Sequence, residues 1–272
     1  MRTSRSILLI VFFAMMLTCA SIPTVTADVQ RQLWAVVVGV EGGGATHLDN
    51  DAQDFADVLT SIYGYPSENI RLLTNSAATK SAVINALNWL ADQEEKPDGV
   101  TIFFSAHGAG NKIKLYNDEQ FWDYELASIL SEFESHNMLV IINACLSGNF
   151  LDVADVIDIG ILLTACSADE STYDISLFAN TIFVEYFLES LSGYVSVQTA
   201  FDYAYANCAD PPGALTPTHP QMVDKYGEGY ILSSPVHAPW FSNFMAVMAV
   251  TVLGYAIYKK KINFSSESTL NN

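Results

Sequence analysis

A histidine and a cysteine each stand directly after an apolar run, on a short stretch of small residues. His107 follows the apolar run 100–104, and Cys145 follows the apolar run 138–142. A thiolate is the reactive form of cysteine, and a nearby imidazole can generate or stabilise it. The glycine after the histidine, Gly108, lets a substrate approach the backbone, where free N–H groups can hold an oxyanion. This pairing predicts a nucleophilic thiol with a histidine beside it.

Each residue taken by itself has a simpler interpretation. A lone cysteine at the end of a strand is more often a small buried apolar residue, and a lone histidine before glycine is more often structural. The hypothesis of a reactive pair therefore depends on the elements that carry His107 and Cys145. These elements must bring the two residues to the same edge of a sheet.

The apolar periodicity of the chain alternates between buried strands and amphipathic helices. Continuous apolar runs are typical of parallel strands that are buried on both faces, and apolar stripes at helical spacing are typical of helices that cover such a sheet. The pattern predicts an α/β domain with a mostly parallel sheet and helices on both faces. Strands are expected at 33–40, 69–74, 100–104, 138–142, 161–164 and, at an edge, 230–232; helices at about 50–62, 79–91, 122–133, 176–192 and 196–207.

The two chemistry-bearing segments follow strands that are separated by one helix. A right-handed crossover would make such strands neighbours. In parallel sheets, function collects at the carboxyl ends of the strands. We therefore expect His107 and Cys145 to face each other on one rim of the sheet.

Both ends of the chain have the composition of targeting segments. Residues 1–27 predict a secretory signal peptide, with two arginines, an apolar stretch and small residues before Asp28. Residues 240–258 are free of charge and mostly apolar, and three lysines follow them, which predicts one transmembrane helix with a cytoplasmic tail at 259–272. The alternative for 240–258 is a buried C-terminal helix. The domain between them, at 28–236, is then expected outside the cytoplasm, in a single-pass type I topology at the cell membrane.

Charge and cysteine content narrow the classes of partner. The formal net charge is −18, and such acidity argues against nucleic acid, whose phosphates would repel the chain.

After removal of the signal, three cysteines remain, Cys145, Cys166 and Cys208; an odd number predicts at least one free thiol. The acidic segment 47–51 lacks the glycine and the spacing of a calcium loop. We expect no metal ion and no cofactor.

The two motifs carry a family resemblance. Phe-Phe-Ser-Ala-His-Gly (103–108) followed by Ile-Ile-Asn-Ala-Cys-Leu-Ser-Gly (141–148) resembles the His-Gly and Ala-Cys-x-Ser-Gly motifs of clan CD cysteine peptidases. This group includes legumains, caspases, metacaspases and the catalytic subunit of the GPI-anchor transamidase. The segment 48–52 is similar to the metacaspase Asn-Asp-Ala motif, and 163–171 resembles the strand and loop after the nucleophile in legumains. The resemblance covers roughly 33–209 and implies a caspase-like fold.

The resemblance also implies residue roles. Cys145 would attack the scissile carbonyl of a peptide or protein substrate, and His107 would protonate the leaving amine and then activate water. The backbone N–H groups of Gly108 and Cys145 would form the oxyanion hole. Asp51, Ser105 and Asn143 correspond to positions that line the pocket for the residue before the cleaved bond.

Two properties stay open at this point: which residue precedes the cleaved bond, and whether water or an amine receives the acyl group. Asn143 departs from the family pattern, because metacaspases carry Asp and legumains Glu two places before the cysteine. Cleavage after Lys or Arg, favoured by Asp51, and cleavage after Asn, which Asn143 could hold, are both expected possibilities. Besides a membrane-anchored endopeptidase, two alternatives remain: a transamidase that passes the acyl group to an amine, and a non-catalytic binding module on the same scaffold.

Overall fold

A six-stranded sheet lies at the centre of the computed structural model, which describes residues 31–42, 46–175, 178–211, 216–227, 230 and 232. The strand order is β2-β1-β3-β7-β8-β9, and every neighbouring pair is parallel except β8 with β9. The strands are β1 (Leu33–Gly39), β2 (Ile70–Thr74), β3 (Gly99–Ser105), β7 (Met138–Asn143), β8 (Ile161–Thr164) and β9 (Gln221–Asp224).

The central strands are apolar throughout because both of their faces are covered. In β1, Ala35 and Val37 belong to the hydrophobic cluster on one face of the sheet, and Val36 and Val38 belong to the cluster on the other. Successive side chains of a strand point to opposite faces, so a strand covered on both sides is apolar at every position. The prediction of a mostly parallel, doubly covered sheet is confirmed.

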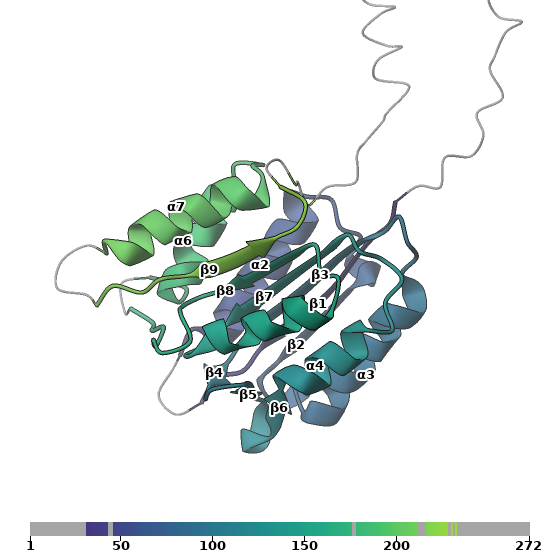
Figure 1. The fold of residues 1–272 in the computed structure, drawn as a ribbon, viewed down its shortest axis with the longest axis horizontal. Helices are drawn as coiled ribbons and strands as arrows, with labels where there is room; N and C mark the ends of the chain where they lie inside the picture. Colours follow the sequence, from purple (N-terminus) through teal and green to yellow (C-terminus); the bar gives the residue numbers. More distant parts are fainter. Residues whose placement is uncertain are drawn as a thin grey trace, which may run out of the picture. The chain divides into compact units, whose positions relative to one another are not determined.

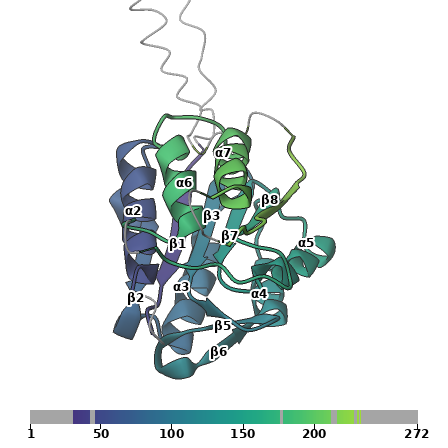
Figure 2. The same cartoon turned by 90° about the vertical axis from the view of Figure 1, so that its left-hand side faces the viewer.

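Three helices lie on each face of the sheet (Figures 1 and 2). One face carries α2 (Leu48–Ser61), α6 (Ile182–Leu191) and α7 (Val197–Ala209), and the other carries α3 (Lys80–Gln93), α4 (Asp123–Leu130) and α5 (Asp152–Val156). Two of the helices begin at conventional caps. The Thr79 hydroxyl accepts a hydrogen bond from the N–H of Ala82, and the Ser196 hydroxyl accepts one from the N–H of Thr199.

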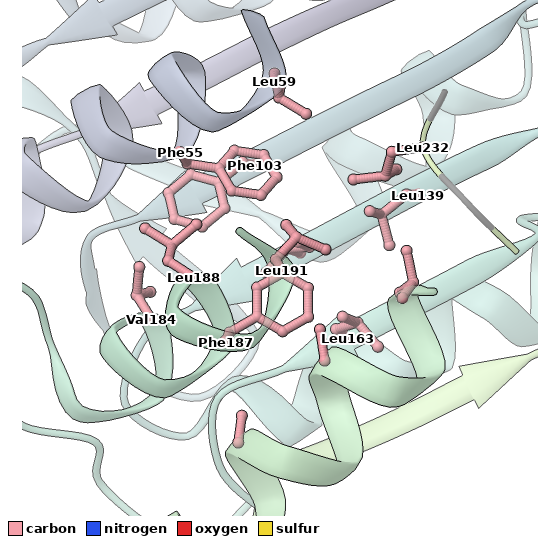
Figure 3. Packing of buried hydrophobic residues seen from close by; sticks show 14 of the residues in the cluster. Phe55, Leu59, Phe103, Leu139, Leu163, Val184, Phe187, Leu188, Leu191 and Leu232 are labelled. Carbon is pink, nitrogen blue, oxygen red and sulfur yellow. The ribbon is translucent and has the colours of Figure 1, made fainter. Parts of the chain in front are cut away.

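Aromatic and branched side chains fill the space between the sheet and α2, α6 and α7 (Figure 3). The rings of Phe55 and Phe103 stack with their centroids 4.6 Å apart, which ties α2 to β3. Phe187, Leu191 and Leu163 pack beside them, so α6 lies over β8 in the same core. This packing holds the N-terminal ends of α2 and α6 next to the carboxyl ends of the strands.

After β3, the chain forms a small antiparallel sheet. It consists of β4 (His107–Gly108), β5 (Lys112–Lys114) and β6 (Gln120–Trp122). Its apolar residues Ile113 and Phe121 belong to the core on the α3 and α4 side. The 3₁₀ turns are η1 (Ser67–Asn69), η2 (Asn75–Ala77), η3 (Tyr116–Asp118) and η4 (Ser147–Leu151).

Two expectations about the elements were wrong in detail. The edge strand is β9 at 221–224 rather than 230–232, since neither Tyr230 nor Leu232 is in a strand and Leu232 is buried in the core instead. The helix expected from about 176 begins at Ile182; residues 178–180 form bends, and Thr181 pairs with Asp174 in an isolated bridge.

The expected signal peptide (1–27) and transmembrane segment (240–258) lie outside the described residues. Among the helices that are described, none combines the length and the apolar character needed to cross a membrane.

Candidate active site

The two motif-bearing strands are neighbours in the sheet, as expected. β3 and β7 pair in parallel, with Ser105 opposite Asn143 at their carboxyl ends. The N–H of Ala106 donates to the Asn143 carbonyl at 3.1 Å, which continues the pairing by one residue. His107 and Cys145 therefore leave the sheet side by side, each two residues beyond this last pair.

The backbone of Gly108 packs directly against Cys145. A Cβ atom built at position 108 would lie 1.9 Å from the carbonyl oxygen of Cys145 and 3.0 Å from the Cβ of Ala144. No side chain fits there, so glycine is required by close approach rather than by a positive φ. This contact brings the histidine segment and the cysteine segment together at the sheet edge.

The histidine ring and the thiol each have a backbone partner. The Nε2 atom of His107 is hydrogen-bonded to the carbonyl oxygen of Gly42. A carbonyl can only accept, so Nε2 carries the hydrogen in the neutral ring and Nδ1 has the free lone pair. The Cys145 thiol donates to the carbonyl of Thr172 at 3.3 Å, and its side chain is partly exposed. Both groups are thus oriented by backbone rather than by a third acidic side chain.

The residue after the cysteine adopts a left-handed conformation that a neighbouring loop stabilises. Leu146 has φ of 59°, and its N–H donates to the Glu170 carbonyl at 2.7 Å. Within the described part of the chain, the N–H of Cys145 has no hydrogen-bond acceptor. A free N–H beside the thiol is what an oxyanion site requires.

The side chain of Glu170 joins this loop to the segment before β9. Its carboxylate accepts from the backbone N–H of His219 at 2.9 Å and lies 2.5 Å from the Nδ1 atom of the same residue. Burial raises the pKa of Glu170, but the hydrogen bonds from His219 and Ser167 outweigh burial and lower this pKa to about 2. Glu170 was not among the predicted site residues; its sequence signal is its place in the legumain-like segment 163–171.

The three predicted pocket residues come together, with a fourth that the sequence analysis missed. Asp51 accepts hydrogen bonds from Ser105 Oγ (2.6 Å), Asn143 Nδ2 (3.0 Å), Thr181 Oγ1 (2.9 Å) and the Thr181 N–H (2.9 Å). Asp51, Ser105 and Asn143 are 0 % exposed and Thr181 is 2 % exposed. In this arrangement Thr181 and its neighbours cover Asp51, and the carboxylate is closed to a substrate side chain.

Burial dominates the electrostatics of this cluster. It raises the pKa of Asp51 to about 6, although the hydrogen bonds from Ser105 and Thr181 partly oppose the shift. Asn143 donates through Nδ2, whereas its buried Oδ1 has no hydrogen-bond partner among the described residues. The cluster therefore holds one unsatisfied acceptor next to a carboxyl group that is ionised at neutral pH.

Asp51 is not a helix cap. Helix α2 begins at Leu48, and Asp51 directs its carboxylate to Thr181 across the site instead of to the first turn of its own helix. Thr181 stands at the N-cap position of α6. Its side chain bonds Asp51 and makes no cap hydrogen bond.

The remaining cysteines are buried core residues, as expected. Cys166 and Cys208 are both 0 % exposed, and all three described cysteines are free thiols. Burial raises the pKa of Cys166 and that of Cys208, the latter to about 12. In the described ranges, no group of three or more His, Cys, Asp and Glu side chains is arranged to hold a metal ion.

The fold and the paired motifs define a class, the caspase-like cysteine peptidases of clan CD. The profile of the Peptidase C13 family matches residues 52–202, and the chain belongs to this family. The match contains both His107 and Cys145.

Curated relatives and solved structures agree with that class. The chain is 30% identical over 129 residues to Metacaspase-1 of Eremothecium gossypii, covering 38% of this chain and 28% of that protein. It is 28% identical over 151 residues to Metacaspase-1B of Aspergillus fumigatus, covering 46% of this chain and 37% of that protein. The chain thus spans about a third of the length of these relatives.

Two solved structures share the fold. Caspase-1 of Spodoptera frugiperda superposes with a TM-score of 0.56 at 12% identity, covering 76% of this chain and 92% of that chain. Protein GSU0716 of Geobacter sulfurreducens superposes with a TM-score of 0.56 at 16% identity, covering 71% and 92%.

Proposed function

We propose that this protein is a membrane-anchored cysteine endopeptidase that uses His107 and Cys145 as its catalytic dyad. The observation that carries the proposal is the contact of Gly108 with Cys145 at the ends of the paired strands β3 and β7. Family membership supports cysteine peptidase chemistry. The membrane anchor rests on the sequence of residues 240–258 alone.

The proposed reaction has two steps. His107 first takes the proton of the Cys145 thiol on Nδ1. The Cys145 sulfur attacks the carbonyl carbon of the scissile bond, and the N–H groups of Gly108 and Cys145 hold the resulting oxyanion. His107 gives that proton to the leaving amine as the C–N bond breaks, which leaves a thioester on Cys145. His107 then removes a proton from water, the water oxygen attacks the thioester, and the thiolate departs and takes that proton back from His107.

The hydrogen bond from His107 to Gly42 supports this role. With Nε2–H held by a backbone carbonyl, Nδ1 is the atom that exchanges protons with the reacting groups. A carbonyl in this position orients the ring without adding a buried negative charge.

The test of the dyad uses three variants of the full chain. Cys145→Ala and His107→Ala should each abolish peptide cleavage while the fold is retained, as judged by circular dichroism. Cys166→Ala should keep most of the activity, because that thiol is buried and its pKa is raised. Cleavage that survives in Cys145→Ala would disprove the mechanism and direct attention to Cys166.

We further propose that the enzyme cleaves after Lys or Arg, or after Asn. Once Thr181 is displaced, an ionised Asp51 and the free Oδ1 of Asn143 are both acceptors, and the Nδ2 group of Asn143 is a donor. A charge-assisted contact to Asp51 is worth about 1.5–3 kcal/mol. That energy corresponds to a preference of roughly ten- to a hundredfold for a cationic side chain.

Matched peptides that differ only in the residue before the cleaved bond test this specificity. Asp51→Asn should lower cleavage after Lys or Arg and leave cleavage after Asn less affected. If cleavage after Lys or Arg is unchanged in an active Asp51→Asn enzyme, Asp51 is a structural residue of the cluster.

Two other functions use the same scaffold. A transamidase would pass the acyl group from Cys145 to an amine instead of water, and mass analysis of the products with and without a small amine separates the two reactions. A non-catalytic binding module would have an unreactive Cys145, which alkylation by iodoacetamide would test. The free N–H and the partly exposed thiol at position 145 favour catalysis over the binding module.

A further inference from the structure

A hollow lies beside His107 and has no role in the reaction as described so far. We call it the hairpin pocket. Residues 40–42 after β1, residues 107–109 and the turn 114–118 line it, and its volume is about 600 Å³. The ring of His107 forms part of its wall, whereas neither Cys145 nor Asp51 lines it.

The hairpin pocket and Asp51 lie on opposite sides of the dyad. Asp51 belongs to α2, whose apolar residues pack on the α6 and α7 face of the sheet. Leu115 in the wall of the hairpin pocket belongs to the core on the α3 and α4 face, and His107 and Cys145 follow the ends of the strands that lie between the two faces. A peptide whose acyl side enters toward Asp51 must place its leaving side toward the hairpin pocket.

Proton transfer requires the same placement. The atom that receives the proton from His107 is the leaving nitrogen, which must come within hydrogen-bond reach of the ring. The side chain next to that nitrogen belongs to the residue after the cleaved bond. The hairpin pocket is the described hollow that this side chain meets, because His107 forms its wall.

The walls of the hairpin pocket carry one more carboxyl group than ammonium groups. Glu41 and Asp118 supply two carboxyl groups, and Lys114 is the single lysine or arginine among the lining residues. Lys114 bonds Asp118 at 3.2 Å, with both side chains largely in solvent. Glu41 and Asp49 behind it form no ion pair with Lys or Arg in the described part of the chain. Burial, and then the hydrogen bond and charge of Asp49, raise the pKa of Glu41.

The turn 116–119, at the edge of the hairpin pocket, has a defined backbone conformation. Asn117 and Asp118 both have left-handed backbones, with φ of 62° and 57°, and the Glu119 N–H returns to the Tyr116 carbonyl at 3.4 Å. This is the geometry of a two-residue hairpin loop, which non-glycine residues occupy at some cost in strain. The loop holds the half-exposed ring of Tyr116 at the pocket, where an aromatic face can also receive a cation.

We propose that the hairpin pocket binds the residue that follows the cleaved bond and selects a cationic side chain, Lys or Arg, at that position. This inference rests on the proposed peptidase function. The wall charges, the ring of Tyr116 and the position beside His107 together define a subsite for a positively charged leaving group. Acidic residues after the cleaved bond are disfavoured by the same carboxylates.

The test is a set of peptides in which one arginine is followed by Lys, Gln or Glu, assayed with the full chain. The masses of the products separate cleavage after the arginine from cleavage after the added Lys. The Lys peptide should have a kcat/KM about tenfold higher than the Glu peptide, because each exposed charge contact changes the rate up to about fivefold. This ratio should fall at high salt, which screens exposed charges.

Variants that remove a negative charge from the hairpin pocket, and one that removes a positive charge, should change the Lys-to-Glu ratio in opposite directions. A purely structural role of these residues would not produce this opposite response. Asp118→Asn, which tolerates the left-handed turn, and Glu41→Gln should each reduce the Lys-to-Glu ratio about two- to fivefold. Lys114→Gln should increase it, since a competing cation is removed. Glu68→Gln, an exposed carboxylate before β2 at the far edge of the sheet, should leave the ratio unchanged.

The outcomes distinguish the inference from the function on which it rests. If all peptides are cleaved with equal kcat/KM, or if the Asp118 and Glu41 variants do not change the Lys-to-Glu ratio, the hairpin pocket does not select a cationic side chain. The proposed peptidase function would then still stand. If no peptide is cleaved at all, the peptidase function fails. Binding of the Lys- and Glu-initiated product peptides to Cys145→Ala, measured by calorimetry, then decides the charge preference of the pocket directly.

Discussion

Gly108 and Cys145 are in backbone contact, with no space between them for even a methyl group. The contact joins the loop that carries the histidine to the loop that carries the thiol. Because the two loops follow adjacent strands, their separation is set by the spacing of the sheet and by this one glycine. The arrangement makes the relative position of His107 and Cys145, the proposed dyad, sensitive to the smallest substitution at residue 108.

Gly108→Ala should therefore inactivate the enzyme. The added methyl would lie 1.9 Å from the Cys145 carbonyl oxygen, so the two loops must move apart. A displacement of about 1 Å in a reacting group costs on the order of a hundredfold in rate. The measurement is kcat/KM, with Gly193→Ala as the control because its methyl would meet nothing nearer than 3.2 Å. Wild-type activity in the Gly108→Ala enzyme would show that the dyad does not depend on this contact.

The buried carboxyl group of Asp51 should make the fold less stable as pH rises from about 4 to about 6. Its pKa is raised from 3.8 to about 6 by burial, so between these values the folded chain keeps a proton that the unfolded chain has lost. The free energy of unfolding then falls with rising pH, by up to about 3 kcal/mol over the interval.

Urea unfolding at a series of pH values measures this dependence. Asp51→Asn should remove most of the fall, since its side chain does not ionise and the hydroxyls of Ser105 and Thr181 can reorient around it. Asp57→Asn, an exposed carboxylate on the same helix, should retain it. An Asp51→Asn protein whose stability still falls over this range would mean that another group titrates there.

The Glu170 side chain should stabilise the loop behind the nucleophile. Glu170→Gln keeps the size of the side chain but loses the acceptor capacity that His219 and Ser167 use, so kcat should fall with little change in KM. Stability at pH 7 should fall by about 1 kcal/mol. Because the pKa of Glu170 is lowered from 4.5 to about 2, this difference from wild type should be full above pH 4.5 and should disappear as pH falls toward 2.

Thermal unfolding and steady-state kinetics of the Glu170→Gln enzyme check this prediction. The matched control is Asp169→Asn, an exposed neighbour in the same loop. Equal effects of the two substitutions on kcat would contradict a specific role for Glu170.

The membrane topology can be checked on cells. Protease added to intact cells should remove the folded domain and leave a small membrane fragment that ends in the lysine-bearing tail at 259–272. An antibody to the tail should detect this fragment only after the membrane is permeabilised. Release of the whole protein by a salt wash, or digestion of the tail from outside, would contradict the type I orientation.

The central strands and the location of the dyad could be predicted because their signals are local. Strands β1, β3, β7 and β8 are continuous apolar runs of four to seven residues that end at polar or small residues. Neighbouring strands joined by one crossover are nearly always arranged in one hand, so His107 and Cys145 were expected at the same rim. Strand β9 escaped prediction because Gln221–Asp224 is short and half-buried, with weak alternation after a polar stretch.

By itself, the amino-acid sequence determined the doubly covered parallel sheet and the adjacent histidine and cysteine loops, and the resemblance of its motifs to a family implied that Asp51, Ser105 and Asn143 meet. Only the tertiary structure decided that Thr181 covers Asp51 across 130 residues of chain and that His219 binds Glu170 across 49. A strand or helix is signalled by neighbours a few residues apart, whereas these contacts depend on how α6 and the segment before β9 pack against the sheet. The same packing buries Asp51 and raises its pKa, which no residue pattern around position 51 could reveal.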